Sequence, residues 1–178
     1  MDLTVKPPKQ LKKYKTKQPP YAHMEGWLPC RCLLTNPSGG GKGIIMLNLA
    51  LKFWRGCFSR IILFSPTCDV DSGWEPLEKH IRHDLKVPEE EPWCYNEFSE
   101  SKLEEILDLQ KKIIQYQKKH NPPGTKMHGL LLLIDDFGAD SQIMKHTKTI
   151  DKLFTQGRHI FVSTILSTQR WMMSSATQ

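Results

Sequence analysis

A glycine-rich segment that ends in a lysine is the part of this sequence best suited to chemistry. It reads Thr35-Asn36-Pro37-Ser38-Gly39-Gly40-Gly41-Lys42-Gly43, between an apolar run that predicts a strand and an apolar stretch that predicts a helix. Phosphate groups bind where backbone N–H groups point into one concavity, which needs glycines, and they gain from a helix N-terminus and a lysine. The segment therefore predicts a phosphate-binding loop. The alternative is a flexible loop with an incidental lysine, which the position between a strand and a helix disfavours. The residues expected to contact a nucleotide are Asn36, Pro37, Ser38, Gly39, Gly40, Gly41, Lys42, Gly43 and Ile44.

Two positions depart from the pattern GxxxxGK[ST]. Asn36 stands where the first glycine is expected, and asparagine adopts left-handed backbone conformations more readily than other non-glycine residues, so this change is expected to cost little. Gly43 stands in place of the serine or threonine whose hydroxyl completes the Mg²⁺ shell. Loss of such a ligand weakens metal-nucleotide binding by roughly 1–3 kcal/mol, and a water can take its place. The sequence thus predicts nucleotide binding and leaves open how far Gly43 impairs turnover.

A second candidate group follows a run of five apolar residues, 130–134, which ends in Asp135-Asp136. An aspartate at the end of a buried strand beside a phosphate loop holds Mg²⁺, and a second acid orients or deprotonates the attacking water. We assign Asp135 to the metal and Asp136 to the base. Alone, such a pair is more often a solvated turn. It forms one site with the loop only if both strands lie in one sheet.

Two further positions belong to the same hypothesis. Ser167-Thr168-Gln169 ends a fourth apolar run, and the carboxyl ends of parallel strands open onto one crevice. Gln169 is therefore expected to sense the γ-phosphate or to hold water, the alternative being an ordinary loop residue. Arg158 either pairs with the end of the preceding helix or projects into a neighbouring subunit as an arginine finger.

The elements that must position these residues alternate between strands and helices, which indicates an α/β fold with a mainly parallel sheet flanked by helices. The strands are apolar on both faces, as in a covered sheet. A buried helix is expected over 43–54, ended by Gly56. A long helix is expected to begin with a capping box of Ser101 and Glu104 and to end at Asn121. The predicted strands are 30–35, 60–65, 129–134 and 159–166, with further helices over 77–85 and 141–156 and an edge strand near Tyr95.

Composition excludes several classes of protein. The chain has 178 residues, 39% of them hydrophobic and 25% charged, which is typical of one globular domain. Its five cysteines form no CxxC pair and have no histidine at zinc-ligand spacing, so neither a disulfide framework nor a zinc site is expected. No apolar run is long enough for a membrane span or a signal peptide. We therefore expect a soluble, intracellular protein with free thiols.

The net charge of +6 is concentrated at the N-terminus, where residues 1–19 hold six lysines and a single aspartate. Four prolines fall within residues 1–20, so we predict a disordered or extended arm over 1–28, followed by a P-loop domain over 29–178. The arm could contact DNA phosphates, act as a nuclear-import signal, or be a solvated leader. Its candidate DNA-binding residues are Lys9, Lys12, Lys13, Lys15 and Lys17.

Taken together, the loop at 36–43, LLLLIDDFG at 130–138, GRHI at 157–160 and STQ at 167–169 resemble the FtsK-HerA superfamily of P-loop ATPases. IILFSPT in the second strand and the IDDFG and GRH segments look most like the viral genome-packaging ATPases of poxviruses, other large DNA viruses, virophages and polinton-like elements. The resemblance covers roughly residues 30–170. Only nine residues follow Gln169, where the family usually continues, which suggests a truncated gene, a split reading frame or a fragment.

The resemblance implies a RecA-like core, a homo-oligomeric ring, and ATP- and Mg²⁺-dependent translocation of double-stranded DNA into a capsid through its portal or vertex. It implies a place in the host cytoplasm or nucleus, or on the virion. Position by position, Lys42 would bind phosphates, Asp135 the metal, and Asp136 would be the catalytic acid. Gln169 would be the sensor and Arg158 the finger. Two alternatives stay open: a catalytically impaired DNA-binding or assembly subunit, and, ranked lower for want of an arginine-rich lid, a small-molecule P-loop kinase.

Overall fold

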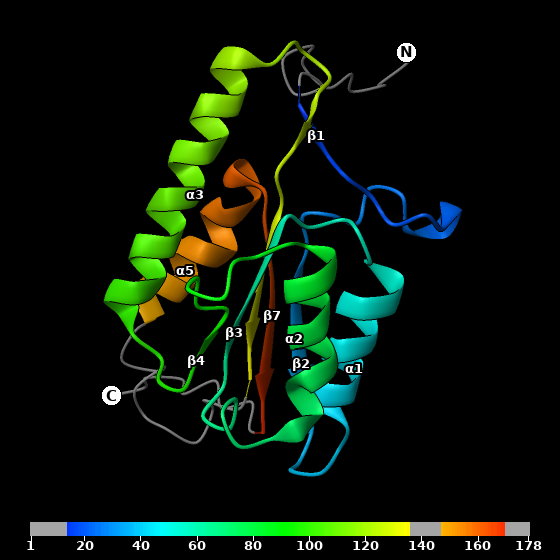
Figure 1. Ribbon diagram of the computed structural model, residues 1–178, viewed down its shortest axis with the longest axis vertical. Helices are drawn as coiled ribbons and strands as arrows, with labels where there is room; N and C mark the ends of the chain where they lie inside the picture. Colours follow the sequence, from blue (N-terminus) through cyan, green and yellow to red (C-terminus); the bar gives the residue numbers. More distant parts are fainter. Residues whose placement is uncertain (1–13, 136–146, 170–178) are drawn as a thin grey trace, which may run out of the picture.

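Five parallel strands form the central sheet of the protein (Figure 1). The computed structural model describes residues 14–135 and 147–169. The strands lie in the order β2-β7-β6-β3-β4, and all their pairings are parallel. The predicted α/β fold with a mainly parallel sheet is confirmed, including the edge strand at Tyr95. The bounds are β2 (Arg31–Thr35), β3 (Arg60–Phe64), β4 (Cys94–Tyr95), β6 (Leu130–Ile134) and β7 (Val162–Thr168).

Helices cover both faces of this sheet. Helix α1 (Lys42–Asn48) continues as the π-helical segment η3 (Leu49–Phe53), and α2 (Glu75–Lys79) continues as η5 (His80–Asp84). These lie on one side, and α3 (Glu100–His120) and α5 (Thr147–Gln156) lie on the other (Figure 1). The side chains of β6 alternate between the two layers. Leu131 and Leu133 pack with the α1 and α2 layer, and Leu130, Leu132 and Ile134 pack with α3 and α5. This explains why the strand is apolar at every position.

Helix α1 is only half covered, although its apolar sequence predicted a buried helix. Met46 and Ala50 are buried, but Ile44 is 66% and Ile45 is 45% exposed. The physical reason is its place over β2, which is the edge strand among the described residues, so only one row of α1 side chains meets the sheet.

Two predicted boundaries are wrong by a few residues. The N-cap of α3 is Ser99, whose hydroxyl accepts from the backbone N–H of Lys102, and not Ser101. Strand β7 begins at Val162 and not at His159, because residues 157–160 form the 3-10 helix η7 (Gly157–Ile160) and Phe161 then turns the chain with a φ of 59°. The predicted end of α3 at Asn121 is confirmed. The predicted helix start at Ser141 lies outside the described residues.

One buried side chain of α3 joins the helix to the sheet. Gln110 donates from Nε2 to the carbonyl oxygens of His128 and Ile160, both at 2.9 Å. These carbonyls come two residues before β6 and two residues before β7. A single amide group thereby fixes the starts of both strands against α3.

Part of the predicted arm is folded onto the domain, so the prediction of disorder is wrong for residues 14–28. Strand β1 (Lys15–Thr16) pairs with β5 (Lys126–Met127), and η2 (Ala22–Met24) follows it. Thr16, Met24 and Leu28 are buried, and the Thr16 hydroxyl donates to the carbonyl oxygen of Leu28 at 3.1 Å. The lysines and prolines of residues 1–20 favoured disorder. Met24 and Leu28, which follow them, are instead buried, and Leu28 belongs to the hydrophobic core.

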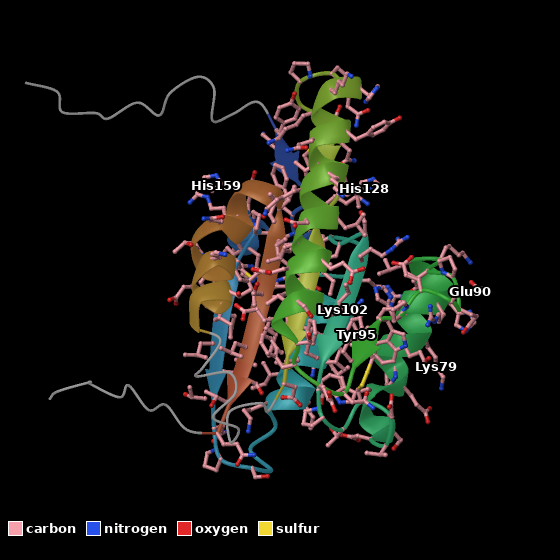
Figure 2. All side chains as sticks on the ribbon, turned by 90° about the vertical axis from the view of Figure 1, so that its left-hand side faces the viewer. Lys79, Glu90, Tyr95, Lys102, His128 and His159 are labelled. Atoms are coloured by element: carbon pink, nitrogen blue, oxygen red, sulfur yellow. A yellow bond between two sulfur atoms is a disulfide. The ribbon has the colours of Figure 1, made fainter. Side chains whose placement is uncertain are left out.

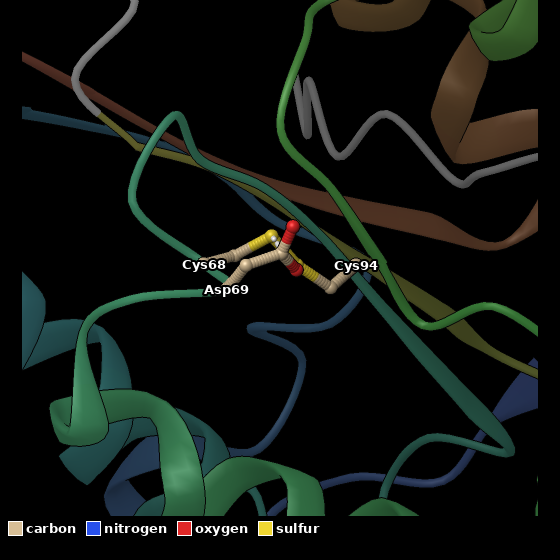
Figure 3. Close-up of side chains that lie close together, drawn as sticks. All are labelled: Cys68, Asp69 and Cys94. Atoms are coloured by element: carbon tan, nitrogen blue, oxygen red, sulfur yellow. Dashed lines mark hydrogen bonds between the residues drawn. A yellow bond between two sulfur atoms is a disulfide. The ribbon is translucent and has the colours of Figure 1, made fainter.

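A disulfide joins Cys68, which follows β3, to Cys94 in β4, with the carboxylate of Asp69 beside it (Figure 3). The Cα atoms are 6.4 Å apart. The prediction of free thiols is therefore wrong for this pair, because the pairing of β3 with β4 brings together two cysteines that are 26 positions apart. Cys30, Cys32 and Cys57 are free.

No helix within the described ranges is both long and apolar enough to cross a lipid bilayer.

Candidate nucleotide site

The glycine-rich loop joins the carboxyl end of β2 to the start of α1, as predicted. Gly39 and Gly41 have φ angles of 74° and 77°, which glycine adopts without the strain that a side chain would bring. Gly41 is the N-cap, and the first backbone bond of the helix runs from Ile45 N–H to Gly41 O at 3.0 Å. The loop therefore ends with the N–H groups of a helix N-terminus, which suit an anion.

Lys42 lies in this loop and is buried, with an exposed fraction of 7%. Its Nζ donates to the carbonyl oxygens of Asn36 at 2.8 Å and Pro37 at 3.1 Å. A buried ammonium group needs partners of opposite polarity, and here the loop itself supplies them. The charge is thus held where a phosphate group between the loop N–H groups would meet it.

Asn36, which stands in place of the first glycine, does not have the left-handed backbone that was expected. It is not among the described residues with positive φ, which are Lys86, Phe161 and five glycines. Instead its side-chain Nδ2 donates to the carbonyl oxygen of Gly40 at 2.7 Å. A Cβ on Gly40 would lie 2.3 Å from that nitrogen, so this arrangement requires glycine at position 40.

Gly43 is the second residue of α1 and has room for a side chain. A Cβ there would lie 3.9 Å from two ring carbons of Trp74, which is ordinary van der Waals contact. Trp74 is buried and covers the start of the helix. Sequence reasoning did not single out Trp74, since nothing in the 30 residues between the two positions indicates their contact. The lack of a hydroxyl at Gly43 is therefore not imposed by packing.

Strand β7 lies between β2 and β6, and this order brings Asp135 and Gln169 to the same edge as the loop. Asp135 directly follows β6, and one of its carboxylate oxygens accepts a hydrogen bond from the buried hydroxyl of Ser167. The backbone N–H of Asn36 donates to Thr168 O at 3.3 Å, which joins the loop to the same strand. The two motifs thus lie in one sheet. Gln169 is half-buried at the end of β7, and Asp136 lies outside the described residues.

This donor set fits Mg²⁺ in the way that the ion is usually held in nucleotide sites. Mg²⁺ prefers oxygen ligands, keeps several waters, and takes one or two carboxylates together with phosphate oxygens. Asp135 is a carboxylate at this edge on the strand next to β7, and Ser167 fixes the direction of its side chain. The residues present therefore suit a phosphate-bound Mg²⁺ with one direct protein ligand.

Arg158 lies in η7, before β7, and so at the end of the sheet opposite the loop. It is exposed. The alternative was that Arg158 pairs with the end of the preceding helix. A different residue makes that contact, because Arg31 Nη1 of β2 donates to the carbonyl oxygen of Phe154 in the last turn of α5. A contact from the edge strand to that helix has no local signal in the sequence.

The three free cysteines are chemically quiet. Burial, and next the neighbouring Cys32, raise the pKa of the Cys30 thiol to about 11. Burial also raises the pKa of Cys32 and of Cys57. The thiolate is the nucleophilic form, so these residues are not suited to nucleophilic catalysis at neutral pH.

Comparison with known proteins adds the following. A family described as "Poxvirus A32 protein" matches residues 27–175. No match is found among curated protein sequences. Among solved structures, the chain is similar to EssC (ATPases 2 and 3) from Geobacillus thermodenitrificans, with 15% identity and a TM-score of 0.51 over 79% of this chain and 28% of that one. It is also similar to the cytoplasmic domain of EssC, with 12% identity and a TM-score of 0.50 over 88% of this chain and 33% of that one. The chain spans about a third or less of these structures, and at such identities the likeness concerns the fold.

Proposed function

Because the chain belongs to the poxvirus A32 protein family, a family of viral genome-packaging ATPases, we propose that it hydrolyses ATP at the 36–43 loop and uses the energy to move double-stranded DNA into a capsid. The observation that carries this proposal is the strand order, in which β7 lies between the strand of the loop and the strand of Asp135. The loop, the candidate metal ligand and Gln169 then face one nucleotide from three adjacent strands.

The roles of the residues follow from where they lie. Lys42 would exchange the carbonyl oxygens of Asn36 and Pro37 for phosphate oxygens, since its ammonium group already lies in the loop. Asp135, oriented by Ser167, would hold Mg²⁺, which neutralises charge on the transferred phosphoryl group when bound. The other reactant would be one water molecule, which attacks in line with the transferred phosphoryl group.

Two further groups complete the proposed chemistry. Asp136, next to the metal ligand in the chain, would orient or deprotonate the attacking water, and Gln169 would contact the γ-phosphate. Arg158 is exposed and at the opposite end of the sheet, so it would act only in the site of a neighbouring subunit. A homo-oligomeric ring that docks on a capsid portal or vertex is therefore part of the proposal.

The test is phosphate release from MgATP by the purified chain, with and without long double-stranded DNA. Lys42→Ala is expected to abolish release, because it removes the only lysine inside the described loop. Lys52→Ala is the matched control, since Lys52 is exposed in the helical segment that follows α1. DNA-stimulated release by the natural chain and by the Lys52 variant alone supports the proposal. Equal rates in the natural chain and Lys42→Ala would refute the site.

A further inference from the structure

The charges of the folded domain are separated along the molecule. Thirteen of the 19 acidic residues fall within 69–108. Residues 109–134 contain no acidic residue but five lysines, and residues 13–24 contain three lysines and no acid. The sum over the domain is small, so the net charge conceals this division.

The structure brings the acid-free segments together at one end of the fold. Lys15 of β1 is in register with Lys126 of β5. The Tyr14 hydroxyl donates to the carbonyl oxygen of Lys118 at 3.2 Å, which ties the N-terminal segment to the last turns of α3. This end lies opposite the nucleotide loop (Figure 1), and His128 and His159 point outward near it (Figure 2). We call it the basic end; its exposed cations are Lys15, Lys17, Lys118, Lys119, Lys126 and Arg158.

These positive charges lack the partners that other lysines have. In residues 14–135 and 147–169, no cation of the basic end forms an ion pair. Other lysines do form ion pairs, namely Lys79 with Glu75, Lys102 with Glu105 and Lys111 with Asp108.

The pairing of Lys15 with Lys126 costs stability by itself, because like charges directly opposite each other on neighbouring strands repel. Such an uncompensated array is suited to a ligand that supplies several negative charges in a row.

We propose that the basic end binds the phosphate backbone of double-stranded DNA; the choice of DNA rests on the function proposed above. Lysines contact phosphates as point charges and carry no base-specific hydrogen-bonding pattern, so the contact is independent of sequence. The lysines come from three separate segments, which matches a repeating polyanion better than a single carboxylate.

The test measures binding of the full chain to a labelled random-sequence duplex between 50 and 200 mM salt. The basic-end variant is K118Q/K119Q/K126Q, which also removes the Lys118 Nζ that lies 5.7 Å from the centroid of the Tyr14 ring and 5.9 Å from that of the Phe161 ring. Each phosphate contact contributes about 0.9 to the slope of log K against log salt, so the slope is expected to fall by about 2.7. At 0.1 M salt this amounts to a loss of affinity on the order of 500-fold.

The matched control is K79Q/K102Q/K111Q, which removes the same charge from lysines that already have acidic partners. It is expected to keep the natural slope. Equal losses in both variants would show a general charge effect and overturn the proposal. If the basic-end variant binds DNA with the affinity and salt slope of the natural chain, the proposal is also overturned, and the surface would suit an acidic protein partner instead.

Folding and hydrolysis are controlled separately. If the triple variant unfolds, K126Q alone removes the repulsion with Lys15, so it is expected to keep or raise the Tm and to lower the slope by about 0.9. An unchanged slope in K126Q overturns the proposal. Lys42→Ala is expected to retain DNA binding and lose hydrolysis. A chain that never hydrolyses ATP but depends on the basic end for DNA binding would refute only the proposed function.

Discussion

Restoring a hydroxyl at position 43 is the sharpest test of how the nucleotide site works. The Gly43→Ser side chain fits, because its Cβ would lie 3.9 Å from the ring of Trp74 and Gly43 is not among the residues with left-handed backbone. The new hydroxyl would directly follow Lys42, the position of the metal-binding hydroxyl in phosphate loops. Gly43→Ala is the matched control, since it adds the same Cβ without the oxygen.

Two contributions can be separated by magnitude. Replacing glycine in a helix stabilises the protein by about 1 kcal/mol for alanine and about 0.5 kcal/mol for serine. For a chain of this size these values raise the Tm by about 1–4 °C. The hydroxyl ligand is worth roughly 1–3 kcal/mol, which corresponds to about 5- to 150-fold tighter MgATP binding. Alanine should therefore give the larger Tm and serine alone the tighter binding.

The assay is titration of ATP in Mg²⁺ and in EDTA, with steady-state phosphate release measured in parallel. Serine is expected to tighten binding only in Mg²⁺. If serine and alanine bind MgATP equally, the metal is not held near position 43 and the reasoning is refuted. If the natural chain shows no turnover and serine creates it, the chain is the catalytically impaired subunit.

Three further predictions concern stability and thiol chemistry. Between pH 9.0 and about 11, the Cys30 thiol stays protonated in the folded state but ionises in the unfolded state, because burial raises its pKa. Its contribution to the free energy of unfolding is therefore complete below pH 9 and is lost as the pH rises through about 11. Alkylation of Cys30 at pH 8, followed by mass spectrometry, should be much slower than in urea; equal rates contradict its burial. Cys94→Ser removes the bond to Cys68 across 26 positions and should cost about 3–4 kcal/mol, or about 7–14 °C in Tm. Reductant should lower the Tm of the natural chain and not that of the variant, and no response in either argues against the bond. Gln110→Met takes the donor from two backbone carbonyls and should cost about 2–4 kcal/mol in urea unfolding, against less than about 0.5 for exposed Gln115→Met; similar midpoints would contradict the role of this amide group.

Much of the fold was predictable because its signals are local. Apolar runs bounded by glycine and proline indicated the strands to within a few residues, and the order of four motifs indicated the family that the profile match confirms. The loop could be placed because a strand, three glycines and a lysine follow one another in the chain. The roles assigned to Lys42, Asp135 and Gln169 stay predictions until the assays above are done.

The features that the sequence did not reveal depend on contacts between distant segments. The disulfide of Cys68 follows from the pairing of two strands, and the cap on α5 comes from Arg31, more than a hundred residues earlier. The folded state of residues 14–28 depends on where Thr16 and Leu28 find cover. In each case the composition describes the isolated segment. Whether the segment folds depends on the free energy of its contacts with residues that are distant in the sequence.

The hydrogen bonds of Gln110 give α3 a mechanical connection to the nucleotide edge. The amide group holds the chain just before β6 and just before β7, and the far ends of those strands carry Asp135 and Ser167. The two strands are in register over five residue pairs, so they resist sliding past each other. A load on the last turns of α3, where the basic end lies, would therefore pull both strands as one body. The strain would reach the metal ligand and its hydroxyl partner about 23 Å away without separating them.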